Sequence, residues 1–314
     1  MKLFIQIPCL NEEKTLPDVL TTIPKKIPGF SSVEILVIDD GSTDKTVAVA
    51  KKHGVKHFVY HRANRGLARS FSDGLDYSLR HGADVIVNTD GDNQYPQADI
   101  PKLVEPILNN EADIVIGDRQ TATIQHFGYL KKTMQKFGSW VVNKAARTDV
   151  PDTVSGFRAY TKDAALRINV VNSFSYCTES IIHAGRNNMA IASVPVTTNP
   201  PTRKSRLFKN MWQHMYKSGK VILKSYFMHE PLKVFLVPGV SLLIISAIPF
   251  VRYLVLTIGD QNPGQHIQSL LLGVALFFSG LLFSVLGVLA DLIKSNRIIN
   301  ENILYRTKRK ELDE

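Results

Sequence analysis

The chain has 314 residues, 44% of them hydrophobic, so it can fold around a core and is neither a disordered chain nor a disulfide-stapled miniprotein. Its scattered Gly and Pro residues exclude a collagen-like or low-complexity architecture. The formal net charge of +10 suits nucleic acid, anionic lipid or phosphorylated substrates, and the positions of the basic residues must decide between these partners.

Short β-branched segments alternate with amphipathic helical patterns over residues 1 to about 200. This alternation predicts an α/β domain with a mainly parallel central sheet, whose ligands bind beyond the carboxyl ends of the strands. Neither a Gly-rich dinucleotide fingerprint nor a phosphate-loop motif is present, which disfavours a Rossmann dehydrogenase or a P-loop hydrolase. The strand candidates are Leu3–Ile7, Val33–Ile38, Phe58–Tyr60, Val85–Asn88 and Ile114–Ile116.

The two cysteines, Cys9 and Cys177, are too few for a disulfide framework or a four-ligand zinc site, so we interpret both as reduced thiols. The N-terminus is a short predicted strand followed by Pro8, which is too brief for the apolar region of a signal peptide. Both features predict that the N-terminal part stays in the cytosol.

Acidic and polar residues follow three of the predicted strands. The first is followed by Pro8-Cys9-Leu10-Asn11-Glu12-Glu13, the second by Asp39-Asp40-Gly41-Ser42, and the strand at 85–88 by Asp90-Gly91-Asp92-Asn93-Gln94. Asp90 and Asp92 can offer hard oxygen ligands to Mg²⁺ or Mn²⁺, and Gln94 adds a neutral carbonyl oxygen. An Asp-x-Asp pair is common in turns, so the metal prediction rests on its place after a strand and on the second acidic pair.

An amphipathic helix is predicted between Leu207 and His229, where aromatic and aliphatic residues recur at helical spacing with lysines between them. The pattern is typical of an interfacial helix on an anionic leaflet and also of a helix packed on its own domain. The membrane interpretation is favoured because an apolar segment follows at once. The recurring residues are Phe208, Trp212, Met215, Tyr216, Ile222, Leu223, Tyr226 and Phe227.

Two long segments without charged residues, Val234–Val251 and Ile267–Ala290, come next. Each can cross a hydrocarbon layer of about 30 Å as a helix, although a buried hairpin of a soluble protein is the alternative. The link at 257–266 contains turn-forming residues and no Lys or Arg, whereas basic residues gather beyond the other two ends. The positive-inside rule therefore predicts a multi-pass protein with both termini in the cytoplasm.

Five motifs in order carry a resemblance to a known family: Pro8-x-Leu-Asn-Glu-Glu13, Asp39-Asp40-Gly-Ser-Thr-Asp44, Asn64-x-Gly66, Asp90-Gly-Asp-Asn-Gln94 and Ser155-Gly-Phe-Arg158. Together they resemble the inverting glycosyltransferases of family 2 with a GT-A fold, of the polyprenyl-phosphate type typified by dolichol-phosphate mannose synthase. The resemblance covers residues 1 to about 206 by motif, and the two-span tail matches bacterial members by architecture only. It implies transfer of a sugar, with inversion, from a nucleotide diphosphate sugar to a polyprenyl phosphate.

The resemblance also implies a division of the chain. Residues 1–206 form the cytosolic GT-A catalytic domain, 207–230 the interfacial helix, 231–293 a transmembrane hairpin and 294–314 a basic cytosolic helix or tail. The expected spans are about 232–256 and 267–293. The tail after Asp291 could pack between subunits of a homo-oligomer.

Several site residues follow from the resemblance alone. Asp40 contacts the base or ribose, Asp90 supports the nucleotide and metal, and Asp92 and Gln94 ligate a Mg²⁺ or Mn²⁺ ion that bridges the diphosphate. The residues placed around the nucleotide are Pro8, Leu10, Asn11, Glu12, Asp39, Asp40, Asp90 and Gly91.

Basic residues are implied on the acceptor side. Arg119 occupies the place of an acceptor-phosphate arginine, assisted by Lys131 or Lys132. The stretch from Arg203 to Arg206 resembles a mobile basic loop that closes over the diphosphate, but it departs from the usual Arg-x-x-Ser-Lys by one spacing; a lipid-headgroup contact is the alternative.

Arg158 and Glu179 each have two possible roles. Arg158 either binds phosphate, on the donor side, or is a partner in a structural salt bridge. Glu179 is either a catalytic base, as in related transferases that act on hydroxyl acceptors, or a carboxylate on a helix surface.

The chemistry favours a phosphate acceptor. A sugar hydroxyl needs a general base, whereas a phosphate monoester has a second pKa near 6 and is already anionic at cytosolic pH. Two anions must then be held together, which explains a site rich in cations and basic residues close to the apolar segments.

The sequence disfavours several other functions. A processive polysaccharide synthase is disfavoured because no Gln-x-x-Arg-Trp motif is present and only one apolar hairpin is predicted. A non-catalytic scaffold or nucleotide-sugar sensor is disfavoured by the intact acidic loop. A nucleic-acid role is disfavoured because the basic residues lie beside apolar segments. Both UDP-sugar and GDP-mannose remain open as donors, with UDP-sugar preferred.

Overall fold

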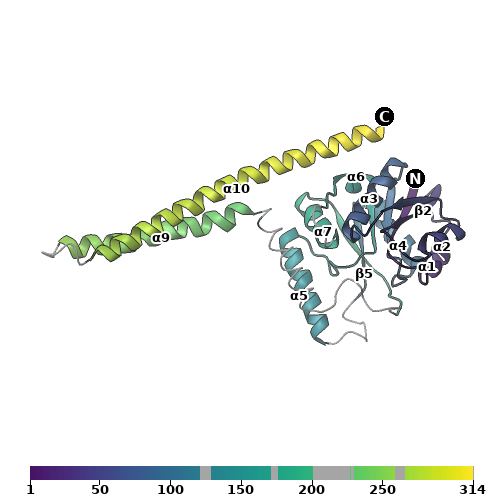
Figure 1. Cartoon of the computed structure of the whole chain (residues 1–314), viewed down its shortest axis with the longest axis horizontal. Coiled ribbons are helices and arrows are strands. Elements are labelled where there is room, and N and C mark those ends of the chain that lie inside the picture. Colours follow the sequence, from purple (N-terminus) through teal and green to yellow (C-terminus); the bar gives the residue numbers. More distant parts are fainter. Residues whose placement is uncertain (121–128, 171–175, 201–226, 228–229, 259–265, 314) are drawn as a thin grey trace. The chain divides into compact units, whose positions relative to one another are not determined.

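The computed structural model describes residues 1–120, 129–170, 176–200, 227, 230–258 and 266–313 (Figure 1). The chain forms two compact units, each described by itself below. One is Met1–Ile222 together with Leu304–Glu314, and the other is Leu223–Ile303.

Within the described residues, the first unit contains a seven-stranded sheet in the order β3-β2-β1-β4-β6-β5-β7. Strands β1 to β4 are parallel, β6 runs antiparallel to both β4 and β5, and β7 is parallel to β5. The predicted α/β domain with a mainly parallel sheet is confirmed, and β6 and β7 are strands that the sequence patterns did not indicate. The strands are β1 (Lys2–Cys9), β2 (Ser32–Asp39), β3 (His57–Tyr60), β4 (Val85–Asn88), β5 (Ile114–Asp118), β6 (Arg158–Thr161) and β7 (Ile191–Pro195).

Helices cover both faces of the sheet because strand side chains alternate between two apolar clusters. In β1, Phe4 joins the cluster that contains residues of α3, α5, α6 and α7, while Leu3 and Ile5 join the cluster that contains residues of α1, α2 and α4. The helices are α1 (Leu16–Thr22), α2 (Thr46–Lys52), α3 (Leu67–Arg80), the short 3₁₀ helix η1 (Gln97–Asp99), α4 (Ile100–Leu108), α5 (Tyr129–Ala146), α6 (Lys162–Arg167) and α7 (Tyr176–Arg186).

The strand order reverses at β1. The chain runs from β1 to β2 to β3 on one side and then returns to β4 on the other side. Cys9 at the end of β1 is paired with Asp39 at the end of β2, and Gln6 is paired with Asn88 at the end of β4. In parallel sheets, ligands bind outside the carboxyl ends of the strands at such a reversal. The loops after β1, β2 and β4 are therefore the expected walls of a site.

The second unit contains helix α9 (Pro231–Ile258) and most of α10 (Ile267–Asp313), each long and apolar enough to cross a bilayer. Gly239 and Gly280 face each other so closely that a Cβ added at Gly280 would lie 2.8 Å from the Gly239 carbonyl oxygen. Small residues at such crossings allow two apolar helices to approach each other directly. Most of the predicted link at 257–266, namely residues 259–265, and almost all of the predicted interfacial helix lie outside the described residues.

Candidate functional site

The loops that follow β1 and β4 lie against each other. A Cβ added at Gly91 would lie 3.1 Å from the Cys9 sulfur and 3.4 Å from Cγ of Glu12, so a glycine allows this close approach without a shift of its neighbours. The Thr15 hydroxyl lies 2.8 Å from both the Gly91 carbonyl oxygen and Oε2 of Glu12. The structure thus brings together Glu12 and the loop that begins at Asp90, as the motifs predict.

The loop after β1 is also fastened to the loop after β2. The Asn11 amide donates to Ser42 Oγ at 2.9 Å, and Asn11 Oδ1 accepts from the Thr43 amide at 2.8 Å. The Glu12 amide donates to Thr46 Oγ1 at 2.8 Å. Asn11 has a φ of 55°, a left-handed conformation that Asn tolerates better than most residues. The predicted pocket residues Asn11 and Glu12 are therefore held in place by their backbone amides and, for Asn11, also by its side chain.

Asp40 is buried and shapes the wall of the predicted nucleotide pocket. Its Oδ1 faces His61 Nδ1 at 2.7 Å and accepts from the Arg65 amide at 2.8 Å, and its Oδ2 accepts from the Gly66 amide at 2.9 Å. On the far side of the His61 ring, Nε2 lies 3.0 Å from Asp73 Oδ2 of α3. Asp40 thereby fixes the loop with the Asn64-x-Gly66 motif and the start of α3. Its neighbour Asp39 accepts from the Ser42 amide at 3.2 Å.

Asp90 rests against the backbone of Gly156. A Cβ added at Gly156 would lie 3.2 Å from Asp90 Oδ2 and 2.9 Å from the Tyr176 hydroxyl. The Gly156 amide donates to the Tyr95 hydroxyl at 3.1 Å, and its carbonyl accepts from Asn88 Nδ2 at 2.9 Å. Both polar groups of Gly156 are thus bound, and the residue forms a fixed floor for the Asp90 carboxylate. The sequence indicated Gly156 only as part of a motif.

Asp92 and Gln94 lie in the same loop, where Asp92 Oδ1 accepts from the Gln94 amide at 3.2 Å. In the described part of the chain, no group of three or more His, Cys, Asp and Glu residues could hold a metal ion. The two Asp carboxylates and the Gln94 amide are nevertheless hard oxygen donors that fit Mg²⁺ or Mn²⁺. An ion held there must complete its coordination with water or with a phosphate ligand.

The segment after β7 is attached to this acidic loop. The Asn199 amide donates to the Gln94 carbonyl at 2.9 Å, and Asn199 Nδ2 donates to the Asn93 carbonyl at 2.9 Å. The predicted basic residues Arg203 and Arg206 lie outside the described residues. Their sequence segment therefore follows directly after a residue that is bound to the acidic loop.

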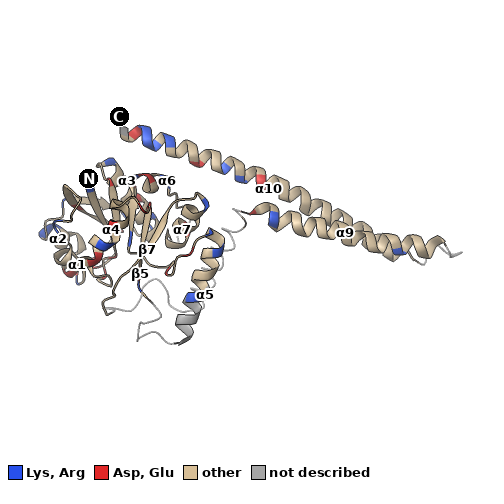
Figure 2. Cartoon of the chain, turned by 180° about the vertical axis from the view of Figure 1, so that it is seen from behind, with Lys and Arg blue, Asp and Glu red and all other residues tan. Residues whose placement is uncertain are grey.

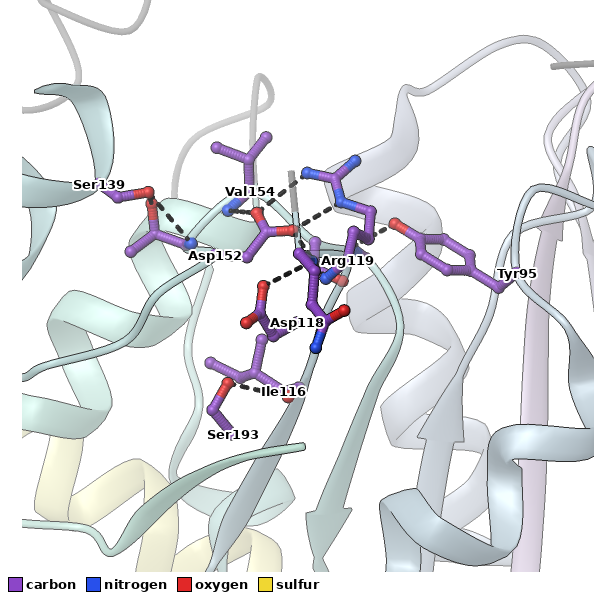
Figure 3. A network of polar contacts seen from close by, with 12 residues as sticks. Tyr95, Ile116, Asp118, Arg119, Ser139, Asp152, Val154 and Ser193 are labelled. Carbon is purple, nitrogen blue, oxygen red and sulfur yellow. Dashed lines mark hydrogen bonds and ion pairs between the residues drawn. The ribbon is translucent and has the colours of Figure 1, made fainter. Parts of the chain in front are cut away.

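Arg119 follows β5 and forms a bidentate ion pair with Asp152 (Figure 3). The two distances are 2.6 Å from Nε to Oδ2 and 2.9 Å from Nη2 to Oδ1. Burial alone would raise the pKa of Asp152, but the hydrogen bond and charge of Arg119 outweigh it and hold that pKa below its ordinary value. The Tyr95 side chain lies beside Arg119 in Figure 3, and its hydroxyl accepts from the amide of Gly156, the residue against which Asp90 lies.

The sequence motifs did not indicate Asp152 or Tyr95. Burial is the main reason why the pKa of the Tyr95 phenol is raised, to about 12, so this side chain stays neutral and can accept the Gly156 hydrogen bond. Tyr95 directly follows the predicted ligand Gln94, which is the signal that could have found it. Asp152 had no comparable signal.

Arg158 is 1% exposed and its guanidinium donates only to neutral acceptors in the hydrogen bonds that define its position. These contacts support a structural role, because a phosphate could reach the group only if the surrounding backbone moved. They do so through neutral acceptors, and the predicted salt bridge is not among the ion pairs of the described residues. The acceptors are the carbonyl oxygens of Thr153, Ser155 and Cys177 and the hydroxyl of Ser180.

Three other predicted residues lie on helices α5 and α7. Glu179 is buried in α7, which excludes a carboxylate on an exposed helix surface. Lys131 and Lys132 belong to α5, and their side chains lie outside what the structure describes.

Comparisons with known proteins agree with this geometry. Residues 4–168 match the family described as "Glycosyl transferase family 2". The chain is 26% identical over 217 residues to the UDP-N-acetylglucosamine–dolichyl-phosphate N-acetylglucosaminyltransferase of Methanococcus voltae, covering 62% of this chain and 85% of the relative. It is 27% identical over 202 residues to the polyprenol monophosphomannose synthase of Mycolicibacterium smegmatis, covering 61% and 75%.

Among solved structures, the chain resembles glucosyl-3-phosphoglycerate synthase from Mycobacterium tuberculosis in complex with Mn²⁺, UDP-glucose and phosphoglyceric acid. The TM-score is 0.53 at 21% sequence identity, over 72% of this chain and 78% of the other. At this identity the likeness shows the shared fold.

The contact between Gly156 and Asp90 predicts a loss of metal affinity in the Gly156→Ala variant. The added methyl group would lie 2.9 Å from the Tyr176 hydroxyl and 3.2 Å from Asp90 Oδ2, so both groups must shift, and changes beside metal ligands cost about 10–100-fold in affinity. Mn²⁺ titration followed by electron paramagnetic resonance measures the effect. The matched control is Gly138→Ala in α5, where nothing lies within 4 Å of an added Cβ. Equal affinity in both variants would contradict the positioning of Asp90 by Gly156.

The buried ion pair predicts a pH-dependent stability. At neutral pH, Asp152→Asn should cost about 3–5 kcal/mol, because it removes the anion that compensates Arg119. The pKa of Asp152 is lowered from 3.8 in the folded state, so the unfolded chain takes up its proton first on acidification. The stabilisation is therefore complete above the unfolded pKa and is lost as pH falls through the folded one. Thermal unfolding at neutral pH and near pH 3 should show the gap between wild type and variant narrowing, and a constant gap would contradict the ion pair.

Proposed function

Because this chain belongs to glycosyl transferase family 2, we propose that it transfers a sugar, with inversion, from a nucleotide diphosphate sugar to a polyprenyl phosphate at a membrane. The observation that carries the proposal is that the loop from Asp90 to Gln94 lies against Glu12 at the strand reversal, in a chain with two helices apolar enough to span a bilayer. Relatives named as dolichyl-phosphate and polyprenol transferases support the acceptor class.

The donor binds in the space bounded by the loops after β1, β2 and β4. The wall fixed by Asp40 receives the nucleoside, and the loop from Asp90 to Gln94 receives the diphosphate. We favour a UDP-sugar, since one named relative uses UDP-N-acetylglucosamine; GDP-mannose is the other candidate. Sugar identity depends on side chains around this space.

Asp90, Asp92 and Gln94 would hold a Mg²⁺ or Mn²⁺ ion, which when bound neutralises charge on the departing diphosphate. The protein's own contribution is preorganisation. Gly156 fixes Asp90, and Asn199 fixes the backbone on both sides of the Asn93–Gln94 peptide link. These carboxylates therefore need little reorganisation when the donor enters.

The acceptor phosphate is ionised at cytosolic pH, so the site must position it beside a second anion rather than deprotonate it. Arg119 is suited to this task because Asp152 fixes its guanidinium, and Lys131 or Lys132 assists it. Arg203 is four residues after Asn199 in the sequence, so an extended chain keeps it within about 14 Å of the acidic loop. It and Arg206 can then cover the diphosphate.

We place α9 and the apolar part of α10 across the membrane, with the catalytic domain and both termini in the cytoplasm. The segment at 207–230 lies in the interface and holds the catalytic domain at the level of the lipid headgroups. A lipid acceptor phosphate reaches the site only at that level.

The Asp92→Asn variant should transfer sugar at least about 100-fold more slowly, because it binds the metal ion and the leaving diphosphate more weakly. The assay incubates purified protein in lipid with Mn²⁺, a polyprenyl phosphate and radiolabelled nucleotide sugars, and measures label that enters the organic phase. Glu105→Gln on the exposed face of α4 is the control and should match wild type. No transfer by wild type with any donor, despite nucleotide binding, would favour a scaffold.

The Glu179→Gln variant tests whether the acceptor is a phosphate or a hydroxyl group. An ionised phosphate needs no base, so lipid transfer should fall by less than about tenfold; loss of a required general base costs about 10²–10⁴-fold. The pH profile of transfer should also keep its shape. A loss of that larger size, with nucleotide binding intact, would contradict an acceptor that attacks without a base.

A further inference from the structure

The last turns of α10 contact α3 and α6 within the first unit. The Tyr305 hydroxyl donates to Asp163 Oδ1 at 2.6 Å, and the Arg167 guanidinium lies 4.2 Å from the centre of the Tyr305 ring. Arg167 Nε also donates to Asp163 Oδ2 at 2.7 Å. One tyrosine of the C-terminal segment thus joins an ion pair of α6 through both its hydroxyl and its ring.

A second group of contacts involves α3. Lys308 Nζ lies 3.2 Å from Asp76 Oδ1, and Arg80 Nη2 lies 3.4 Å from Glu311 Oε2. In one ion pair the C-terminal segment supplies the cation, and in the other it supplies the anion. A shift of the segment along α3 would place like charges next to each other, so the two pairs fix its register. Leu312 packs against the apolar cluster beneath α3 and α6. Exposed ion pairs are individually weak, but here they surround an apolar contact and an aromatic one.

The docked face follows helical spacing. Tyr305, Lys308 and Leu312 are half-buried at intervals of three and four residues, whereas Arg306 and Arg309 are exposed. Figure 2 shows that charged residues gather along the last part of α10, while α9 and the beginning of α10 contain few of them. The charged end of α10 is therefore specialised for a contact with protein on one of its faces.

The position of this segment in the chain gives the contact its meaning. Helix α10 begins in the apolar second unit and is continuous to Asp313, yet its residues from Leu304 onward belong to the first unit. The family match ends at residue 168, so it does not cover this segment. A catalytic domain joined to the apolar helices only before α9 has one attachment, and docking of 304–313 gives it a second.

We propose that Leu304–Asp313 is a clasp that binds α3 and α6 of its own chain and limits the movement of the catalytic domain relative to the apolar helices. Its effect on catalysis rests on the proposed function, since a second attachment raises the effective concentration of the active site at a membrane-bound acceptor. The C-terminal segment thus binds a surface of its own chain, which is made by Asp76, Arg80, Asp163 and Arg167.

Charge reversal tests the clasp in the full chain reconstituted in lipid. Asp76→Lys and Lys308→Asp, made singly, should each raise hydrogen exchange of residues 304–313 at least about tenfold, because like charges then face each other. The double variant should restore protection. Arg306→Gln is the matched control, since it removes a charge from the exposed face, and it should exchange like wild type. Unchanged exchange in both single variants would overturn the clasp.

A mixture of the two single variants identifies the partner. Docking within one chain predicts no recovery of protection when Asp76→Lys chains and Lys308→Asp chains are reconstituted together. Recovery in the mixture would overturn the proposal and assign the segment to a neighbouring copy.

The catalytic part of the proposal has its own readout. The single variants should transfer sugar to a membrane-embedded polyprenyl phosphate about 3–10-fold more slowly, with Mn²⁺ and nucleotide affinities unchanged. Faster exchange without slower transfer would overturn the role in catalysis. Absence of transfer in wild type would instead refute the proposed function, and the exchange results would still decide whether the clasp exists.

Discussion

The contact between the loops after β1 and β4 is the constraint on which the candidate site depends. Their strands are neighbours in a sheet, where strand spacing is about 4.8 Å, so the two loops must share a narrow space. Gly91 allows this approach because it places no side chain between Cys9 and Glu12. Thr15 then joins the loops through its hydroxyl. Glu12 is brought next to the loop that begins at Asp90 as a result.

The charged residues around this contact divide into two groups. Asp40, Asp152 and Arg158 are almost completely buried. Asp40 and Arg158 bind backbone groups, and Asp152 binds the Arg119 guanidinium. They determine where other residues lie. Asp90 and Asp92 are only partly buried and are positioned by that framework. A site that must hold two phosphate-bearing substrates benefits from this division, because fixed charges stabilise charge that develops in a reaction better than mobile ones do.

Much of the sheet and the acidic loop could be predicted from local patterns. The strand at Val85–Asn88 has the predicted bounds, and the other four predicted strands extend by a few residues at most. Strand β6 was not predicted, because it begins with Arg158, a charged residue that becomes acceptable in the core only through its contacts with residues distant in sequence. Strand β7 is an edge strand with mixed burial and a terminal proline, which weakens its pattern.

Several contacts in the site could not be predicted from local sequence patterns, because they join residues that are distant in the sequence. Arg119 and Asp152 are separated by 33 residues, and Tyr95 meets Gly156 across 61. The basic tail was predicted from its charge, but its docking on α3 and α6 depends on a surface assembled from Asp76 and Asp163. Charge and periodicity indicate that such a helix exists, whereas its partner is decided by tertiary structure.

The most direct test of the acidic loop as the diphosphate site is spectroscopic. Mn²⁺ added to the full chain with a nucleotide diphosphate should show hyperfine coupling to ³¹P and should lose bound water relative to free Mn²⁺. Both signals should disappear when Asp90 and Asp92 are replaced by Ala. A Mn²⁺ ion that keeps its full hydration and shows no ³¹P coupling in the wild-type complex would contradict the central role given to this loop.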